Sequence, residues 1–184
     1  NVNKEFLVKI LQKRLSSQAC LNPRGWDTVG RDKYLNSGRM LIKIQDGCQR
    51  FCSYCIVPYL RGTPKSETIK NLVRQLADKN YKGKVNEVIL TAINTEAFGL
   101  DTGEKIVTLI DQMIEVTKIP RISFGSIHPW SINEEFIKYY KRILPLKRLV
   151  NFFHIPIQSG SNKMLKLIKR GYTREEIMLK LIEI

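Results

Sequence analysis

Residues 40–55 of this chain read MLIKIQDGCQRFCSYC, an apolar run that leads directly into three closely spaced cysteines. The first five residues predict a buried strand, and Cys48, Cys52 and Cys55 follow it in a C-x3-C-x2-C pattern. Structural zinc takes four ligands, usually as two separated pairs, and the fourth cysteine of the chain, Cys20, is isolated. Three ligands on a 4Fe–4S cluster would leave one iron open to a substrate or cofactor. A chance group of buried cysteines is the alternative.

Strands and helices alternate along the chain outward from this stretch. Further strands are predicted at residues 85–91, 121–126 and 149–157. Apolar positions at helical spacing predict helices at residues 69–77 (with a stop at Gly83), 106–114, 136–144 and 164–168, and a capping box at 173–176 opens one more. This alternation predicts an α/β fold, a partial (β/α) barrel of parallel strands with covering helices that is truncated at the C-terminus.

Polar clusters follow each predicted strand. The cysteines come after the first strand, residues 94–96 after the second, residues 126–129 after the third and residues 158–160 after the fourth. Because parallel sheets bind their ligands at the carboxyl ends of the strands, we expect these loops to form the site.

The charge of the chain is strongly basic and unevenly distributed. The formal net charge is +14 over 184 residues, with 10 basic and 4 acidic side chains in residues 1–50 and 11 and 3 in residues 138–184. A phosphate-rich partner would suit the two basic ends, and solvated helix faces of a lysine-rich chain are the alternative.

The composition excludes several classes of protein. It is close to the globular average, which excludes collagen-like and wholly disordered chains. No apolar run is long enough to span a membrane, and residues 1–5 show no signal sequence. Four cysteines in a chain of this length favour a metal or catalytic use in the cytoplasm over a disulfide scaffold.

The cysteine pattern, with Tyr54 before its last cysteine, resembles the signature of the radical S-adenosylmethionine enzymes. Its wider context resembles the methylthiotransferase branch of that superfamily, in residues 43–62, 125–130, 154–161 and 170–173. The resemblance covers about residues 39–184 and is strongest to the tRNA threonylcarbamoyladenosine methylthiotransferases. The isopentenyladenosine and ribosomal-protein methylthiotransferases are the nearest alternatives.

This resemblance implies a chemistry and a set of partners. Cys48, Cys52 and Cys55 would bind a 4Fe–4S cluster whose open iron chelates S-adenosylmethionine, and reductive cleavage would yield methionine and a deoxyadenosyl radical. The implied partners are a tRNA substrate and a reducing electron donor, with no membrane. A non-catalytic module that binds metal or nucleic acid is the alternative of another class.

Several single residues are given expected roles. Tyr54, Ser126 and Gln158 are expected to contact the cofactor, although Tyr54 could be a core aromatic and the other two could cap helices. His154 is expected to be a core histidine. Arg61 could pair with a carboxylate or phosphate, or remain a solvated loop charge.

The sequence also departs from the family. Residues 1–38 are expected to be a linker and a possible tail of a missing N-terminal domain, and residues 39–184 an incomplete radical core. Ala92 stands where the family usually has glycine, which leaves the substrate open. A lone Cys20 cannot hold the second cluster that supplies sulfur, so the chain alone should cleave S-adenosylmethionine without forming a methylthio product.

Overall fold

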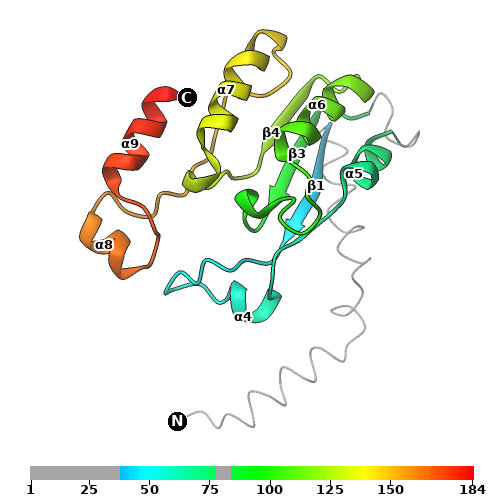
Figure 1. Cartoon of the computed structure of the whole chain (residues 1–184). Helices are drawn as coiled ribbons and strands as arrows, with labels where there is room; N and C mark the ends of the chain where they lie inside the picture. Colours follow the sequence, from blue (N-terminus) through cyan, green and yellow to red (C-terminus); the bar gives the residue numbers. More distant parts are fainter. Residues whose placement is uncertain (1–37, 78–83) are drawn as a thin grey trace, which may run out of the picture.

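A four-stranded sheet forms the centre of the computed structural model, which describes residues 38–77 and 84–184 (Figure 1). The sheet order is β2–β1–β3–β4, with β1 parallel to β3 and β3 parallel to β4. A short β2 pairs antiparallel with the end of β1. The strands are β1 (Arg39–Asp46), β2 (Lys65–Ser66), β3 (Glu87–Ala92) and β4 (Arg121–Phe124).

Helices follow the strands in the predicted alternation. They are α4 (Val57–Arg61), α5 (Ile69–Leu76), α6 (Ile106–Val116), α7 (Glu134–Ile143), α8 (Asn162–Leu167) and α9 (Arg174–Glu183), with 3-10 turns at Thr95–Ala97, Pro129–Ser131 and Leu144–Leu146. Side chains cap several of them: Asn133 accepts from the Phe136 amide, and the predicted capping box of Thr173 and Glu176 is confirmed at α9. Within the described residues, each helix is too short or too polar to cross a lipid bilayer.

The first strand is buried on one face only. Met40, Ile42 and Ile44 lie in the core, whereas Leu41 on the other face is 42% exposed. Alternating side chains point to opposite faces of a strand, so the helices cover one face of the sheet and the opposite face is open. The open face is the one that faces inward in a barrel, so the predicted buried strand is present at β1 and is buried on the face that the helices cover.

Aromatic packing joins the sheet to α7. Phe124 at the end of β4 lies edge-on to Phe136, with ring centroids 6.0 Å apart, and Phe153 packs against both rings. Tyr140 completes the group at 5.2 Å from Phe153. Residue 153 is thereby held to the core although it belongs to no regular strand.

The predicted fourth strand at 149–157 is wrong as a strand. One bridge, Leu149 to Ile122, aligns the segment parallel to β4, and the Ile127 amide bonds the His154 carbonyl further along. Beyond the bridge Phe152 is 69% exposed, and Pro156 has no amide hydrogen to donate. The segment therefore follows the sheet without extending it.

Some expectations lie outside the described residues. These are the helix stop at Gly83, Cys20 and the domain assigned to residues 1–38. The short helix α4 and the strand β2, both inside the loop that follows the cysteines, were not predicted. The α/β class and the partial parallel barrel of the prediction agree with the observed sheet and helices.

Candidate functional site

The three cysteines lie on one loop at the carboxyl end of β1. Cys48 and Cys52 are buried, Cys55 is partly exposed, and all three thiols are free. The Cys48 amide donates to the Gly62 carbonyl at 3.1 Å, and the Ser53 amide donates to the Ile168 carbonyl at 3.2 Å. The loop is therefore fixed both to the segment before β2 and to the end of α8, far along the chain.

The donor set of this loop, three free thiols, is of the kind that binds an iron–sulfur cluster. Within residues 38–77 and 84–184, no three His, Cys, Asp or Glu side chains gather so as to hold one metal ion. A 4Fe–4S cluster places each cysteine on a different iron, so its thiolates need not converge on one point. Burial raises the pKa of the Cys48 thiol, and loading with metal must therefore displace a proton from it.

A buried arginine connects the cysteine loop to the C-terminal part of the chain. Arg170 is only 4% exposed, and its Nη1 lies 3.5 Å from Cys52 Sγ and 3.3 Å from the Tyr54 hydroxyl. Its Nη2 donates to the Pro156 carbonyl at 2.8 Å, and its Nε donates to the Tyr172 hydroxyl at 3.0 Å. Burial acts to lower the pKa of Arg170, but the bonds to Tyr172 and Cys52 outweigh it and raise the pKa, so the side chain is a cation.

Trp130 lies between two guanidinium groups. The Arg170 guanidinium carbon is 4.5 Å and that of Arg50 is 4.6 Å from the centroid of the indole ring. Arg50 also forms an ion pair with Glu96 in the loop after β3. The His128 ring stacks on Trp130 with centroids 5.3 Å apart and planes at 9°. These contacts join the loops after β1, β3 and β4, as their placement at one edge of the sheet predicts.

His128 is neutral in this environment. Burial lowers its pKa to about 4, and the charges of Arg170 and Arg50 act in the same direction. Its Nδ1 is buried without a hydrogen-bond partner among the described residues. The sequence analysis gave this residue no role.

The expected cofactor contacts lie around the same edge of the sheet. Tyr54 is 55% exposed, so it is no core aromatic, and its hydroxyl contacts Arg170. Ser126 bonds His154 Nδ1 at 2.8 Å, and Gln158 is exposed with a left-handed backbone, φ +72°. Neither Ser126 nor Gln158 caps a helix, because the caps that follow them are Asn133 for α7 and Ser161 for α8.

Two further expectations have clear outcomes. His154 is exposed and bonded to Ser126, so the expectation of a core histidine is wrong. Arg61 pairs with Asp46 at 3.1 Å, which agrees with its expected carboxylate partner. Burial acts to raise the pKa of Asp46, but the Gly47 amide and the charges of Lys43 and Arg61 outweigh it and lower the pKa.

Sequence reasoning gave no role to the residues that connect the site. Arg170 and Trp130 belong to motifs on which the family resemblance rests, and Asn94 belongs to a polar cluster after a predicted strand. None of the three was given a role from the sequence. Trp130 beside Pro129 in the loop after β4, and Arg170 beside Gly171 in the turn after α8, are the signals that could have identified these two residues.

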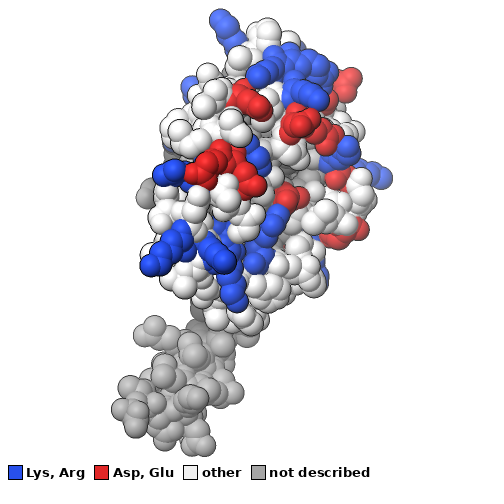
Figure 2. Space-filling model, turned by 60° about the vertical axis from the view of Figure 1, so that its left-hand side comes forward, with Lys and Arg blue, Asp and Glu red and all other residues white. Residues whose placement is uncertain are grey.

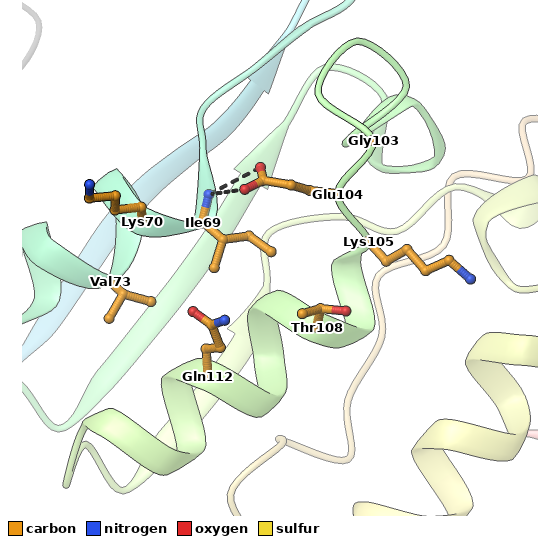
Figure 3. Close-up of a pocket in the computed structure, with 8 residues that line it drawn as sticks. All are labelled: Ile69, Lys70, Val73, Gly103, Glu104, Lys105, Thr108 and Gln112. Atoms are coloured by element: carbon orange, nitrogen blue, oxygen red, sulfur yellow. Dashed lines mark hydrogen bonds between the residues drawn. The ribbon is translucent and has the colours of Figure 1, made fainter.

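A separate pocket of about 590 Å³ lies between α5 and α6 and shares no residue with the cysteine loop (Figure 3). At the side of the pocket, both oxygens of the Glu104 carboxylate accept hydrogen bonds from the Ile69 backbone amide, at 3.0 and 3.1 Å. Its lining is Ile69, Lys70, Val73, Gly103, Glu104, Lys105, Thr108 and Gln112. The carboxylate caps the N-terminus of α5, which is a structural role on the helical side of the sheet.

Basic side chains gather on part of the surface. Figure 2 shows one group of Lys and Arg toward the lower end of one face and another toward its upper end, with most of the Asp and Glu between them. On α8 and the turn after it, Lys163, Lys166 and Lys169 are exposed at intervals of three residues. This exposed row lies beside the cysteine loop, because the Ser53 amide bonds Ile168 between them.

Comparisons with known proteins agree with this geometry. A family model described as the radical SAM superfamily matches residues 42–182. The threonylcarbamoyladenosine tRNA methylthiotransferase MtaB of Aquifex aeolicus is 34% identical over 189 residues, covering 96% of this chain and 44% of the relative. A tRNA-2-methylthio-N(6)-dimethylallyladenosine synthase of Buchnera aphidicola subsp. Cinara cedri is 41% identical over 140 residues, covering 73% of this chain and 31% of the relative.

A solved structure supports the fold alone. The cobalamin-dependent S-adenosylmethionine radical enzyme OxsB matches with a TM-score of 0.58 at 19% identity, covering 79% of this chain and 22% of that one. The chain spans less than half the length of the two curated relatives named above.

Proposed function

The chain belongs to the radical SAM superfamily, in its methylthiotransferase branch, and from this we infer that it is the radical-generating part of a tRNA-modifying enzyme. The observation that carries the proposal is the loop at the carboxyl end of β1 that brings together Cys48, Cys52 and Cys55, the first two of them buried. A 4Fe–4S cluster bound there with S-adenosylmethionine supplies one-electron reductive cleavage of the sulfonium, which generates a radical able to remove a hydrogen atom from a substrate. A reducing partner must deliver that electron.

The residues of the chain bind, orient and shield these groups. The three thiolates hold the iron, and the contacts of Cys48 and Ser53 with Gly62 and Ile168 keep the loop in place. We assign Tyr54, Ser126 and Gln158 to contacts with S-adenosylmethionine. Tyr54 and Ser126 follow β1 and β4 at the carboxyl edge of the sheet, and Gln158 follows Pro156, whose carbonyl accepts from the same arginine that contacts Tyr54. Such preorganised loops reduce the reorganisation needed for reaction.

The proposed substrate is a modified adenosine in tRNA, which places the enzyme with tRNA in the cytoplasm. We favour threonylcarbamoyladenosine, since the relative that covers 96% of this chain is named for it. Dimethylallyladenosine, the same base as the isopentenyladenosine considered from the sequence, is the second candidate, supported by a relative of higher identity over a shorter stretch. The positive net charge of +14 supports a polyanionic substrate of either kind.

Anaerobic reconstitution tests the proposal. The full chain, incubated with iron and sulfide, should bind close to four irons and then convert S-adenosylmethionine to deoxyadenosine and methionine when dithionite is added. Single Cys48→Ala, Cys52→Ala and Cys55→Ala variants should lose the visible absorbance and the cleavage, while Cys20→Ala, the matched control, should retain both. Zinc held by four cysteines, or loss of the cluster in Cys20→Ala alone, would contradict the proposal and favour a non-catalytic module.

The substrate is tested separately. Rates of deoxyadenosine release with tRNA stem-loops bearing threonylcarbamoyladenosine, dimethylallyladenosine or plain adenosine should be compared. Stimulation by the first alone supports our preference, and stimulation by the second alone supports the other candidate.

A further inference from the structure

Arg170 carries a buried charge whose partners are neutral groups. It is 4% exposed, and its hydrogen bonds reach one carbonyl, two phenols and the thiol of Cys52. Among residues 38–77 and 84–184 it forms no ion pair with a carboxylate. Four hydrogen bonds to neutral groups offset part of the cost of burying this cation, and an anion in contact with it would offset more.

One of these contacts can become anionic. The phenols of Tyr54 and Tyr172 offer uncharged hydroxyl groups to the guanidinium. The Pro156 carbonyl cannot become an anion. The face of the Trp130 ring, whose centroid lies 4.5 Å from the guanidinium carbon, supplies only a cation–π attraction. The sulfur of Cys52, 3.5 Å from Nη1, becomes anionic when it binds metal.

We propose that Arg170 is a positioning residue that holds Cys52 in place and supplies the counter-charge for its sulfur, which makes a cluster bound there easier to reduce. This inference rests on the proposed function. Hydrogen bonds to the ligand sulfurs and nearby positive charge favour the reduced, more negative state of an iron–sulfur cluster. The same guanidinium bonds Pro156 and Tyr172, and so it also fixes the cysteine loop to the segment after α8.

Arg50 provides a matched comparison within the same site. Its guanidinium lies over the same indole at 4.6 Å, but its charge is paired with Glu96, and its side chain is not bonded to a cysteine sulfur in the described residues. The two arginines therefore share an aromatic neighbour and differ in the contact that the inference requires.

The midpoint potential of the reconstituted cluster tests the inference. The full chain and its Arg170→Gln, Arg170→Lys and Arg50→Gln variants should be titrated with dithionite and mediators and followed by electron paramagnetic resonance. We expect a more negative potential for Arg170→Gln, an intermediate one for Arg170→Lys, and a value near the wild type for Arg50→Gln. An unchanged potential in Arg170→Gln, or an equal shift in Arg50→Gln, would overturn the inference.

The outcomes separate this inference from the proposed function. A wild-type chain that assembles no cluster through its three cysteines contradicts the function, whereas an assembled cluster with an unaltered potential in Arg170→Gln contradicts only the role of Arg170. If Arg170→Gln binds no iron, the Arg170→Lys variant provides the test. A cluster that assembles in Arg170→Lys supports the role of the positive charge at residue 170. An Arg170→Lys variant that binds no iron but unfolds like the wild type contradicts that role.

Discussion

Nε1 of Trp130 donates a hydrogen bond to Oδ1 of Asn94 at 2.9 Å and so joins the loops that follow β4 and β3. The backbone amide of Asn94 in turn donates to Oε1 of Gln45, also at 2.9 Å. Nε2 of Gln45 donates to the Gly47 carbonyl, next to the first cysteine of the loop. Asn94 and Gln45 are both buried. A continuous chain of hydrogen bonds thus connects the indole to the cysteine loop.

Trp130→Phe should lower the free energy of unfolding by about 1–3 kcal/mol, because it leaves the buried Asn94 amide group without its donor. Asn94→Ala should destabilise the chain by a similar amount. Urea unfolding of the two single variants and the double variant checks this, and the double variant should lose less than the sum of the singles. Fully additive losses would show that the two side chains do not act together.

Gly47→Ala should destabilise the chain and impair iron binding. Its φ is +81°, and a Cβ would lie 2.4 Å from the Thr63 carbonyl oxygen, so the residue before Cys48 would have to move. Gly103→Ala is the matched control, since its φ is +75° but a Cβ there meets no atom within 4 Å, and Gly103 lies in the loop before α6, away from the cysteines. We expect a loss of about 1–2 kcal/mol for Gly103→Ala from the positive φ and a larger loss for Gly47→Ala.

Iron content after reconstitution provides the second measurement. It should fall in Gly47→Ala and remain near the wild type in Gly103→Ala. Equal behaviour of the two variants would mean that the close approach to Thr63 does not position the cysteine loop.

Much of the fold follows from local patterns in the sequence. The strands at β1, β3 and β4 were predictable because short apolar runs alternate with amphipathic stretches, and this alternation specifies a parallel sheet with helical cover. Residues 149–157 have an equally apolar pattern, yet they form only one bridge. Pairing depends on the neighbouring strand and on available amide donors, and a local pattern does not contain that information.

The residues of the site were likewise predictable only in part. The cysteines were evident because three identical reactive groups stand at fixed short spacing. Arg170 and Cys52 are 118 residues apart, and an arginine in a loop is ordinarily exposed, so neither its burial nor its contact with sulfur could be inferred. His154 was misjudged for the converse reason, because an apolar neighbourhood in sequence did not become a buried one in space.

Ser123→Ala should destabilise the fold without affecting the cluster. Its hydroxyl donates to Oε1 of the buried Glu87 at 2.7 Å, and Arg39 donates to the other oxygen at 3.1 Å. Glu87 is the first residue of β3, at the opposite end of that strand from the loop that reaches the site. We expect a loss of about 1–3 kcal/mol in chemical unfolding and unchanged iron content. A loss of iron would indicate that this end of the sheet is coupled to the cysteine loop.

His128 should make stability depend on pH below neutrality. Its pKa in the folded chain is about 4, below the usual value of about 6.5, owing to burial and the charges of Arg170 and Arg50. The unfolded chain therefore gains a proton between these two values that the folded chain does not, and stability is lost as the pH falls from about 6.5 to about 4. The loss should be on the order of 1 kcal/mol per pH unit.

Urea unfolding of the wild type and His128→Gln at pH 7, 6 and 5 measures this contribution. As the pH falls, the free energy of unfolding of the wild type should decrease more than that of His128→Gln. Parallel pH profiles would show that the pKa of His128 is the same in the folded and the unfolded chain. Carbon-13 resonances of the histidine rings would then identify which residue titrates.

The final prediction concerns the exposed row of Lys163, Lys166 and Lys169. They belong to α8 and the turn after it, and this segment contacts the cysteine loop where the Ser53 amide bonds the Ile168 carbonyl. A tRNA whose base enters the site would place its backbone near this segment. Each phosphate that a lysine neutralises releases counterions, so tRNA affinity should fall steeply with salt, with a slope on a logarithmic plot of about 0.7–0.9 per contact.

Replacing the three lysines together by glutamine should weaken tRNA binding at low salt and reduce that slope by about 2–3. The matched control replaces Lys118, Lys138 and Lys141, which are also exposed and change the net charge equally. Two of these lie on α7, well away from α8 in Figure 1. Filter binding or fluorescence anisotropy at several salt concentrations provides both quantities. If the salt-dependence slope falls equally in the control and the test variant, tRNA binding depends on net charge alone. Lys163, Lys166 and Lys169 would then have no specific part in binding tRNA.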